Sequence, residues 1–372
     1  MNKRILKSLG LVAISSLFAV ILAESLLHAF PSLLPVEVRQ ALNDKGRAHP
    51  VIGNLPQSNS SGAIVTRDFE SPYQLDNNGF RNDGDWPENV DIAVIGDSLV
   101  FGYGVDVESA WPQRLTELTD QSVINLGLIG ASPQHSRKIH EVFARPLKPE
   151  IIVFGFFARN DFWDADKYAR WEQSGVGGNY LEWRGFGSPT AEEYSRPIYR
   201  ILYAIRKRSY VLALVKFGRD ALSGKKRVQP SEISLASGAK MLLHGNDFER
   251  KTLYASPGNE VFDRVVDELR RLRDATLSDG SRLIVLLQPA KEEVYRETEG
   301  AILPDASVGI RASLKQLQIE YVDATANLRR RAESGEELYF PTDGHPNAQG
   351  YAAFAELLAD YLESSRVSEI PR

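Results

Sequence analysis

The chain has 372 residues, of which 43% are hydrophobic and 25% are charged, so it is a folded globular protein and not a disordered or fibrous one. Its formal net charge of −5 argues against a nucleic-acid-binding protein as a whole. The absence of cysteine excludes disulfides, thiolate nucleophiles, iron–sulfur clusters and cysteine zinc sites, and it is compatible with an oxidising compartment.

The first thirty residues predict an export or membrane signal. Three basic residues precede an uncharged run over residues 8–23, which is the arrangement of a secretory leader. This run is short for a membrane span of about 20 residues, but continuing through Glu24 to Phe30 lengthens it to 23. We expect residues 1–30 to be an uncleaved signal anchor, with a cleaved signal peptide or a buried helix as alternatives. In the first two cases the rest of the chain lies outside the cytoplasm, on the periplasmic side.

The remainder predicts a lead-in followed by an α/β domain. Residues 31–90 are rich in Pro, Asn, Ser and Gly, and predict a linker or an irregular lead-in. Buried strands are expected at 91–96, 122–126, 150–156, 282–287 and 319–323. Helical patterns are expected at 107–119, between the second and third strands, and at 258–278, 307–317 and 347–364. Residues 91–365 should therefore form a three-layer α/β/α sandwich on a five-stranded, parallel, flavodoxin-like sheet.

A long segment interrupts this alternation between the third and fourth strands. It predicts a helical insertion at about 160–255. Within it, residues 195–227 hold ten basic residues and one acidic residue, interleaved with apolar ones. This stretch is either a solvated helix packed on the main domain or a surface that contacts anionic lipid or an acidic polymer. A nucleic acid is not expected as its partner in an exported chain.

The strongest chemical signal follows the first strand, where the sequence reads VIGDSL over residues 94–99. A serine directly after a strand lies where a parallel sheet places its active site. Ser98 therefore becomes the candidate nucleophile, and it needs a base to accept its proton. His345, in the segment PTDGHPN, is placed to be that base, and Asp343 is placed to orient its ring.

Two further blocks follow the second and third strands, NLGLIG at 125–130 and ARND at 158–161. With the blocks around Ser98 and His345, they resemble the SGNH or GDSL hydrolase family over residues 90–160 and 280–360. The resemblance implies an oxyanion hole formed by the Ser98 and Gly130 backbone N–H groups and the Asn160 side-chain amide. It also implies an ester hydrolase or acyltransferase without a cofactor.

The sequence departs from the family pattern at two points. The family usually has Asp-x-x-His, whereas this chain has the shorter Asp-x-His at 343–345, and its third block begins with Ala158 in place of Gly. The shorter form resembles membrane-attached members and the alginate acetyltransferase-like branch. The segment YQLDNNGFR at 73–81 resembles the lead-in of membrane-attached members that occur with polysaccharide machinery.

Three polar residues near these blocks are secondary candidates. Asp97 is expected to fix the Ser98 loop by hydrogen bonds and is a candidate substrate contact. Arg159 is a candidate for binding an acidic substrate, and His244 is a candidate to line a cleft. No cluster in the sequence has the spacing of a zinc or calcium site, so neither a metal nor a cofactor is expected.

The leading hypothesis is an extracytoplasmic serine esterase or O-acyltransferase. It would act on acyl esters of glycans, with acetyl as the expected acyl group. A non-catalytic glycan-binding or polysaccharide-assembly accessory protein with the same fold is the alternative. A lipid-acting esterase is a third possibility, motivated by the basic stretch beside a membrane anchor. The sequence does not distinguish hydrolysis from transfer.

Overall fold

A computed structural model describes residues 3–40, 46–185, 187–222, 230–235, 237–244, 254–295 and 307–369. The chain divides into two compact units. The first, which we call the helical unit, comprises Met1–Asp44 and Pro189–Arg227. The second, which we call the sheet unit, comprises Lys45–Ser188 and Val228–Arg372. Each is described by itself.

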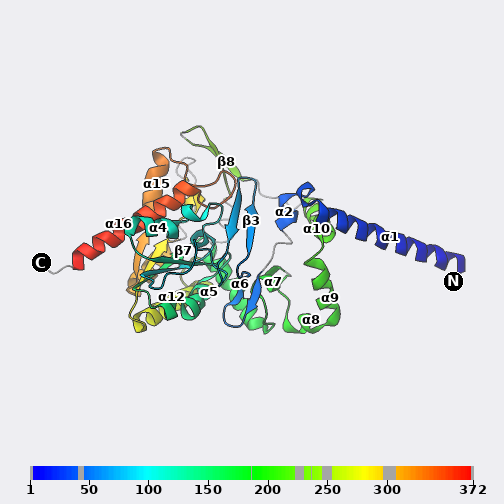
Figure 1. The fold of residues 1–372 in the computed structure, drawn as a ribbon, viewed down its shortest axis with the longest axis horizontal. Coiled ribbons are helices and arrows are strands. Elements are labelled where there is room, and N and C mark those ends of the chain that lie inside the picture. Colours follow the sequence, from blue (N-terminus) through cyan, green and yellow to red (C-terminus); the bar gives the residue numbers. More distant parts are fainter. Residues whose placement is uncertain are drawn as a thin grey trace. The chain divides into compact units, whose positions relative to one another are not determined.

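A five-stranded parallel sheet forms the centre of the sheet unit (Figure 1). Its strands are β5 (Ile92–Gly96), β6 (Val123–Gly127), β7 (Ile151–Phe156), β10 (Arg282–Leu287) and β11 (Glu320–Asp323). They lie in the order β6-β5-β7-β10-β11, and every neighbouring pair is parallel. This flavodoxin-like order reverses between β5 and β7, where sheets of this kind place their sites. The α/β fold predicted from the sequence is confirmed.

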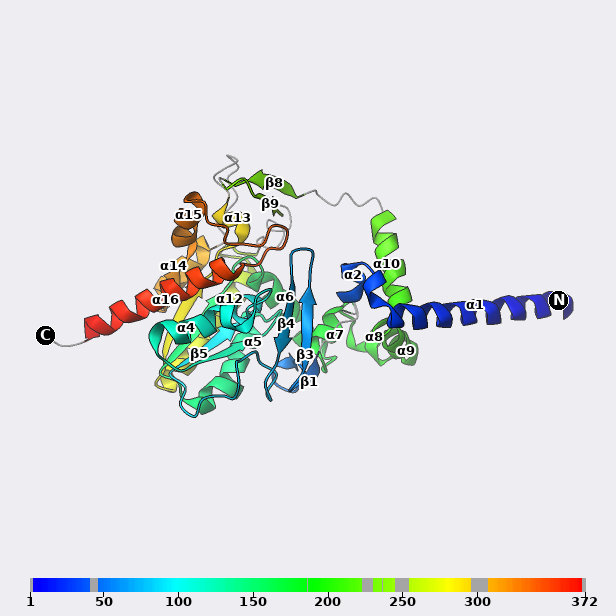
Figure 2. The same cartoon turned by 45° about the horizontal axis from the view of Figure 1, so that its top comes forward.

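Helices cover both faces of this sheet (Figures 1 and 2). On one face, α4 (Trp111–Thr119) packs against α16 (Ala348–Glu369). On the other, α12 (Glu260–Ser278) packs against α5 (Pro133–Ile139) and α6 (Asp161–Ser174). Shorter elements complete the unit: α3 (Ser98–Phe101), η2 (Val107–Ser109), η3 (His140–Ala144), η4 (Arg145–Leu147), α7 (Tyr180–Gly185), β8 (Ser231–Ser234), β9 (Lys240–Leu243), α13 (Lys291–Val294), α14 (Val308–Gln316) and α15 (Thr325–Glu333).

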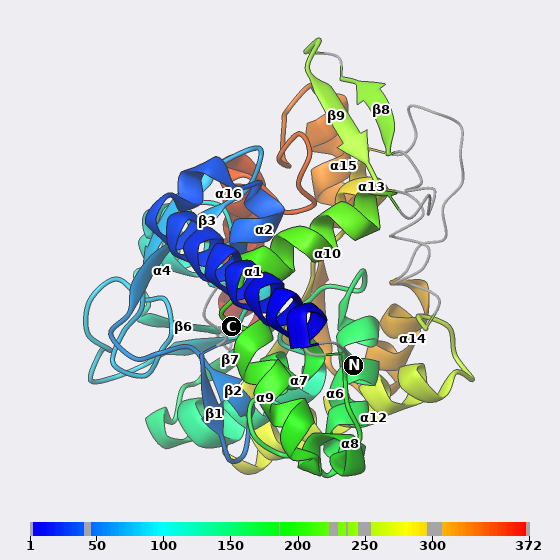
Figure 3. The ribbon, with the colours of Figure 1, turned by 90° about the vertical axis from the view of Figure 1, so that its right-hand side faces the viewer.

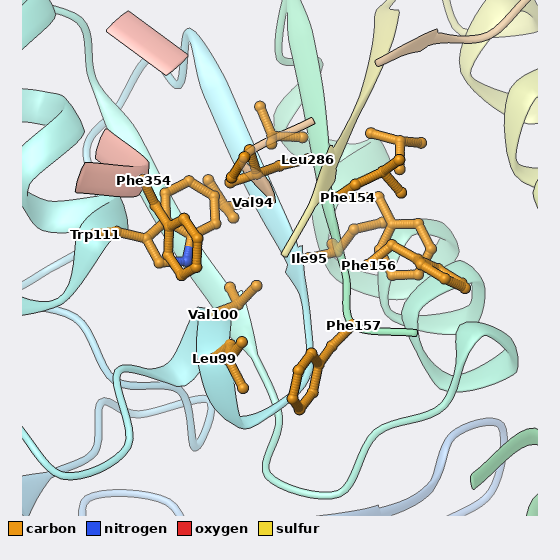
Figure 4. Close-up of a cluster of buried hydrophobic side chains, with 14 of the residues drawn as sticks. Val94, Ile95, Leu99, Val100, Trp111, Phe154, Phe156, Phe157, Leu286 and Phe354 are labelled. Atoms are coloured by element: carbon orange, nitrogen blue, oxygen red, sulfur yellow. The ribbon is translucent and has the colours of Figure 1, made fainter. Parts of the chain in front are cut away.

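The core is built from the alternating faces of the central strands (Figure 4). Trp111 and Phe354 lie on one side of β5, while Phe154 and Phe156 of β7 lie on the other. All four side chains are fully or almost fully buried. Because both faces of the sheet are covered, the strands are continuous runs of apolar residues. The strands could therefore be located from the sequence.

The lead-in contains more structure than its composition predicts. It holds two antiparallel hairpins, formed by β1 (Arg47–His49) with β2 (Gly53–Leu55) and by β3 (Ser61–Val65) with β4 (Glu70–Gln74). These strands are only three to five residues long, too short for a recognisable alternation of apolar and polar residues. Phe80 and Arg81, further along, are buried in the sheet unit.

Three glycines form a row at the carboxyl end of the sheet. Gly96 of β5 pairs with Gly127 of β6 on one side and with Gly155 of β7 on the other. A Cβ atom at Gly127 would overlap the backbone of Val100 and Phe101, and one at Gly96 or Gly155 would overlap the Val100 side chain. The row therefore lets α3, which begins at Ser98, lie directly on the ends of three strands.

The helical unit contains α1 (Lys3–Ala29), η1 (Pro31–Leu33), α2 (Val36–Gln40), α8 (Ala191–Ser195), α9 (Pro197–Arg206) and α10 (Tyr210–Leu222). Within it, α10 packs against α1 and α2 (Figure 3). Residues Ser8–Ala29 of α1 are long and apolar enough to cross a membrane, a test that a signal sequence also passes. The segment 160–255, expected as one helical insertion, is thus divided between the two units. Lys225, Lys226 and Arg227 of its basic stretch lie outside the described residues.

The glycine row predicts the effect of adding one methyl group beneath α3. Gly127→Ala should lower the free energy of unfolding by about 1–3 kcal/mol, because the new Cβ meets backbone atoms that cannot rotate away. Urea unfolding measures this change. Gly185→Ala is the matched control, because a Cβ there has no neighbour within 4 Å. Equal stability of the two variants would contradict the close approach of α3 to the sheet.

Candidate active site

Ser98 is held at the junction of β5 and α3. The Asp97 side chain caps α3 by accepting a hydrogen bond from the Leu99 backbone N–H at 2.9 Å. As the first residue of the helix, Ser98 directs its own N–H out of the helix, because no preceding turn supplies an acceptor. Its residue surface is only 6% exposed, so its hydroxyl lies in a largely enclosed position.

The loop before α16 brings a histidine and a carboxylate to this hydroxyl. Ser98 Oγ lies 2.9 Å from His345 Nε2, and His345 Nδ1 lies 2.6 Å from Asp343 Oδ1. The same Asp343 oxygen accepts the His345 backbone N–H at 2.9 Å. Because one oxygen contacts both the ring and the backbone of His345, the carboxylate reaches the imidazole even though only one residue separates Asp343 from His345. The Tyr103 ring stacks on the imidazole with 4.2 Å between ring centres.

The environment keeps the Asp343 carboxylate ionised. Burial alone would raise the pKa of Asp343, but the hydrogen bonds and charge of His345, with the nearby Lys291 ammonium, lower it to about 2. A carboxylate that stays charged near neutral pH can hold one imidazole tautomer and stabilise an imidazolium. Asp343 therefore meets the electrostatic requirement for orienting His345.

A buried lysine ties the His345 loop to the body of the sheet unit. Lys291 Nζ donates to the backbone carbonyls of Asp343 at 2.8 Å, Phe340 at 3.1 Å and Pro341 at 3.3 Å. Burial lowers the pKa of Lys291 to about 8, with Glu292 and Asp343 opposing the shift. Its three donors match three loop carbonyls, so it fixes the loop without competing for the imidazole.

Asp68, in the turn between β3 and β4, holds the same loop from the other side. Its carboxylate accepts the backbone N–H of Thr342 at 2.8 Å and of Asp343 at 2.6 Å. It also accepts the Thr342 hydroxyl at 2.8 Å. Charge-assisted hydrogen bonds of this kind are short and strong. A residue of the lead-in thus helps set the position of the carboxylate that contacts His345.

Arg81 restrains the segment that follows Ser98, as Lys291 and Asp68 restrain the loop that carries His345. It is 2% exposed, and its guanidinium donates to the Gly102 carbonyl at 2.6 Å and the Val105 carbonyl at 2.7 Å. These carbonyls follow the last turn of α3, where helix carbonyls need external donors. Arg81 is the last residue of the segment YQLDNNGFR, which the sequence analysis compared with the lead-in of membrane-attached family members.

The three residues expected to form an oxyanion hole follow three neighbouring strands. Ser98 follows β5, Gly130 follows β6 and Asn160 follows β7. Gly130 has φ +74° in a turn closed by a hydrogen bond from Ala131 N to Leu128 O, so a side chain there would be strained. The Asn160 amide nitrogen lies 3.2 Å from both Asp97 Oδ2 and Asp164 Oδ2.

A group of buried carboxylates lies beneath these residues. Burial raises the pKa of Asp97 to about 6, although hydrogen bonds from Leu99 and Asn160 oppose the shift. Burial, with the charge of Asp97, raises the pKa of Asp161 well above its ordinary value. Asp97 is only 1% exposed, so the structure places it as a support for the Ser98 loop and the Asn160 amide. The part of the chain that the structure describes contains no group of three or more His, Asp or Glu side chains placed to hold a metal ion.

Arg159 and His244 both lie beside the His345 loop. An Arg159 guanidinium nitrogen is 3.7 Å from the fully buried Glu292, and a side chain at Gly344 would collide with the guanidinium. His244 Nε2 lies 2.9 Å from the Thr342 carbonyl, and its backbone N–H donates to Glu292 at 3.0 Å. Both residues therefore lie beside the loop that carries His345, and their roles in substrate binding stay predictions.

The structure brings all the sequence candidates to one end of the sheet and adds others. Ser98, Asp343 and His345 form a continuous hydrogen-bonded chain. Sequence analysis missed Asp68, Arg81, Lys291 and Tyr103. Arg81 ends a segment that the sequence analysis had quoted. Asp68 and Lys291 carry no local signal, because a charged residue in a loop or short helix is ordinarily exposed to solvent. Tyr103 carries none either, because its contact is with a ring that is distant in sequence.

The contacts of Asp68 predict a role in positioning the loop. Asp68→Asn should lower kcat about 10- to 100-fold, because a hydrogen bond to a charged group contributes about 1.5–3 kcal/mol. KM should change little, because the carboxylate contacts the loop and not the substrate. Steady-state hydrolysis of 4-nitrophenyl acetate separates the two constants. Asp85→Asn, at an exposed position, is the control, and a loss confined to KM would contradict the assignment.

The raised pKa of Asp97 predicts a pH dependence of stability. Its folded-state value of about 6 exceeds the ordinary 3.8, so the folded state binds more protons between these values. The stabilising contribution is therefore complete below about pH 4 and is lost as the pH rises through 6. Asp97→Asn should flatten this dependence in urea unfolding, whereas Asp83→Asn, which is exposed, should retain it. An unchanged slope in Asp97→Asn would refute the assignment.

A family model and several solved structures are similar to this chain. The GDSL-like Lipase/Acylhydrolase family model matches residues 94–353. The chain is similar to a lipolytic protein of the G-D-S-L family from Desulfitobacterium hafniense, with 14% identity, coverage of 73% of this chain and 99% of that chain, and a TM-score of 0.38. It is also similar to a two-domain esterase active on acetylated mannans, with 12% identity and a TM-score of 0.41. This similarity covers 76% of this chain and 51% of the esterase.

A third similar structure is an acetylxylan esterase from Geobacillus stearothermophilus, with 12% identity, coverage of 72% of this chain and 92% of that chain, and a TM-score of 0.37. No curated protein matches the chain significantly. The family match covers well over half of the sequence and includes the segments that carry Ser98, Gly130, Asn160 and His345. The chain therefore belongs to the GDSL-like lipase/acylhydrolase family, the SGNH type of ester hydrolase.

Proposed function

We propose that the protein is a serine esterase or O-acyltransferase in which Ser98, His345 and Asp343 act as a catalytic triad. The observation that carries this proposal is the pair of contacts at His345, 2.9 Å to the Ser98 hydroxyl and 2.6 Å to the Asp343 carboxylate. Both distances are within the range required for proton transfer and for orientation of the base.

The reaction would proceed in two displacements. Ser98 Oγ attacks the ester carbonyl as His345 Nε2 takes its proton, and the resulting tetrahedral intermediate carries the negative charge on the former carbonyl oxygen. The ester C–O bond then breaks, and the imidazolium returns the proton to the leaving alcohol. Water or a sugar hydroxyl next attacks the acyl-Ser98 ester, with His345 again taking and returning a proton.

The Ser98 and Gly130 backbone N–H groups and the Asn160 amide would stabilise the oxyanion. Such donors are each worth about 3–4 kcal/mol in the transition state. The Asn160 amide nitrogen faces Asp97 and Asp164 in the resting site, so its donation to an oxyanion requires exchange of one of these partners. The two backbone N–H groups require no such exchange.

We infer an acylated glycan as the substrate, with acetyl as the acyl group. A groove of about 810 Å³ is lined by Phe340 and Asn347 of the loop that carries His345, but Ser98, His345 and Asp343 are not among its lining residues. Most of its lining is polar, including Glu70, Asp106 and Gln349, which suits sugar hydroxyls. Arg159 is the residue we propose for contact with an acidic substituent.

We also propose that the protein is a membrane-anchored enzyme whose sheet unit lies outside the cytoplasm. Three basic residues precede the apolar part of α1, which favours retention of its amino-terminal end inside. This location is consistent with the proposed place in the polysaccharide-associated, alginate acetyltransferase-like branch. Cleavage of the leader would instead give a secreted enzyme.

Hydrolysis of 4-nitrophenyl acetate tests the proposed chemistry. Ser98→Ala should lower kcat about 10⁴-fold or more, because no other group replaces the nucleophile. Ser364→Ala is the matched control, because this exposed hydroxyl only bonds the Tyr361 carbonyl of its own helix. Equal turnover by wild type and Ser98→Ala would refute the nucleophile and favour the accessory-protein alternative.

A further inference from the structure

The helix α9 exposes a stripe of large apolar side chains. Ile198, Ile201, Leu202 and Ile205 recur at the spacing of one helix face, and they are 51–61% exposed. A single exposed apolar side chain is normal in a soluble protein, whereas a contiguous exposed stripe indicates an interaction surface. The neighbouring α10 adds Leu212, Val215 and Leu222, which are also exposed.

Basic side chains surround this apolar surface. Those exposed in the described part of the basic stretch are Arg196, Arg200, Arg206, Lys207, Arg208, Lys216 and Arg219. On α9, Arg206 lies at one edge of the apolar stripe, Arg200 lies on the opposite side of the helix, and Lys207 and Arg208 follow the helix in the turn before α10. An apolar stripe with flanking basic residues is the pattern of a helix that lies in the interface of an anionic membrane.

Hydrogen bonds join these helices to the carboxyl end of α1. The Glu24 carboxylate accepts the Ser209 hydroxyl at 2.7 Å, the Tyr210 backbone N–H at 2.6 Å and the Val211 backbone N–H at 3.2 Å. It thereby caps the first turn of α10. His28 Nε2 lies 3.0 Å from the Arg208 carbonyl.

These contacts fix the depth of α9 and α10 relative to the apolar helix. Glu24 and His28 lie in the last two turns of α1, where a span that begins inside would leave the membrane. The turn that joins α9 to α10 is therefore held at the outer interface. The contacts also give α1 a structural role in the folded chain, which favours its retention over its removal as a leader.

We propose that α9 and α10 form a membrane-surface platform, with the apolar face of α9 inserted among the lipids and its basic flanks on anionic headgroups. The occupant of this surface is an anionic lipid bilayer. The inference rests on the membrane location proposed above and is independent of the ester chemistry. The apolar stripe supplies the insertion, and the basic residues supply the preference for anionic lipid.

The cysteine-free sequence allows a direct test with the full chain. Ile201→Cys, carrying an environment-sensitive fluorophore, is reconstituted into vesicles of phosphatidylcholine alone or with phosphatidylglycerol. In anionic vesicles the emission should shift to the blue, and lipid-borne quenchers should place the probe about 5–10 Å below the headgroups. In neutral vesicles, at high salt, or with Arg206→Glu added, both effects should weaken. Leu118→Cys, at an exposed leucine of the sheet unit, is the matched probe and should remain unquenched.

Co-flotation of the chain with the vesicles distinguishes the failure of the platform proposal from the failure of the membrane-anchor proposal. If the chain floats with anionic vesicles but the probe at residue 201 stays in water, the platform is refuted and the anchor stands. If the chain does not float with vesicles, both are refuted. A blue shift of the probe at residue 201 without quenching by lipid would show that a protein covers the apolar face of α9. Quenching of this probe that equals quenching of the probe at residue 118 would show non-specific contact with the vesicles. Either result would overturn the proposal.

Discussion

The hydrogen bond between Ser98 and His345 is the contact on which the rest of the site depends, because its two partners lie 247 residues apart. A shift of about 1 Å in either loop would remove the geometry that a proton transfer requires. The surrounding structure restrains both loops. The row of Gly96, Gly127 and Gly155 lets the serine helix lie against the sheet, and Arg81 fixes its end. Lys291 and Asp68 fix the histidine loop from two sides through its carbonyl and N–H groups.

This arrangement gives the lead-in a function. Asp68 and Arg81 come from a segment without long apolar runs, yet one contacts the histidine loop and the other the serine loop. The segment is therefore part of the structure that holds the candidate active site in place. The same structure explains how a shortened Asp-x-His sequence retains its geometry, because one Asp343 oxygen accepts both the ring and the backbone N–H of His345.

The sheet and the candidate site residues could be predicted from the sequence because each has a strong local signal. Five buried strands appear as apolar runs, and Ser98, Asn160 and His345 stand in distinctive blocks near strand or helix ends. The short hairpins of the lead-in could not be predicted, because three to five residues show no clear periodicity. Asp68 and Lys291 could not be predicted either, since their partners are backbone groups that are distant in sequence and carry no residue-type signature. Likewise, the basic stretch indicated an anionic surface, but only the structure joins it to Glu24 of α1.

The central claim is that Ser98 is activated by His345. Mass-spectrometric mapping of the adduct formed with a fluorophosphonate probe tests it most directly, because the probe reacts only with an activated serine. The account predicts one adduct, on the peptide that contains Ser98, and its loss in His345→Ala. An adduct on a different serine, or an undiminished adduct in His345→Ala, would contradict the account.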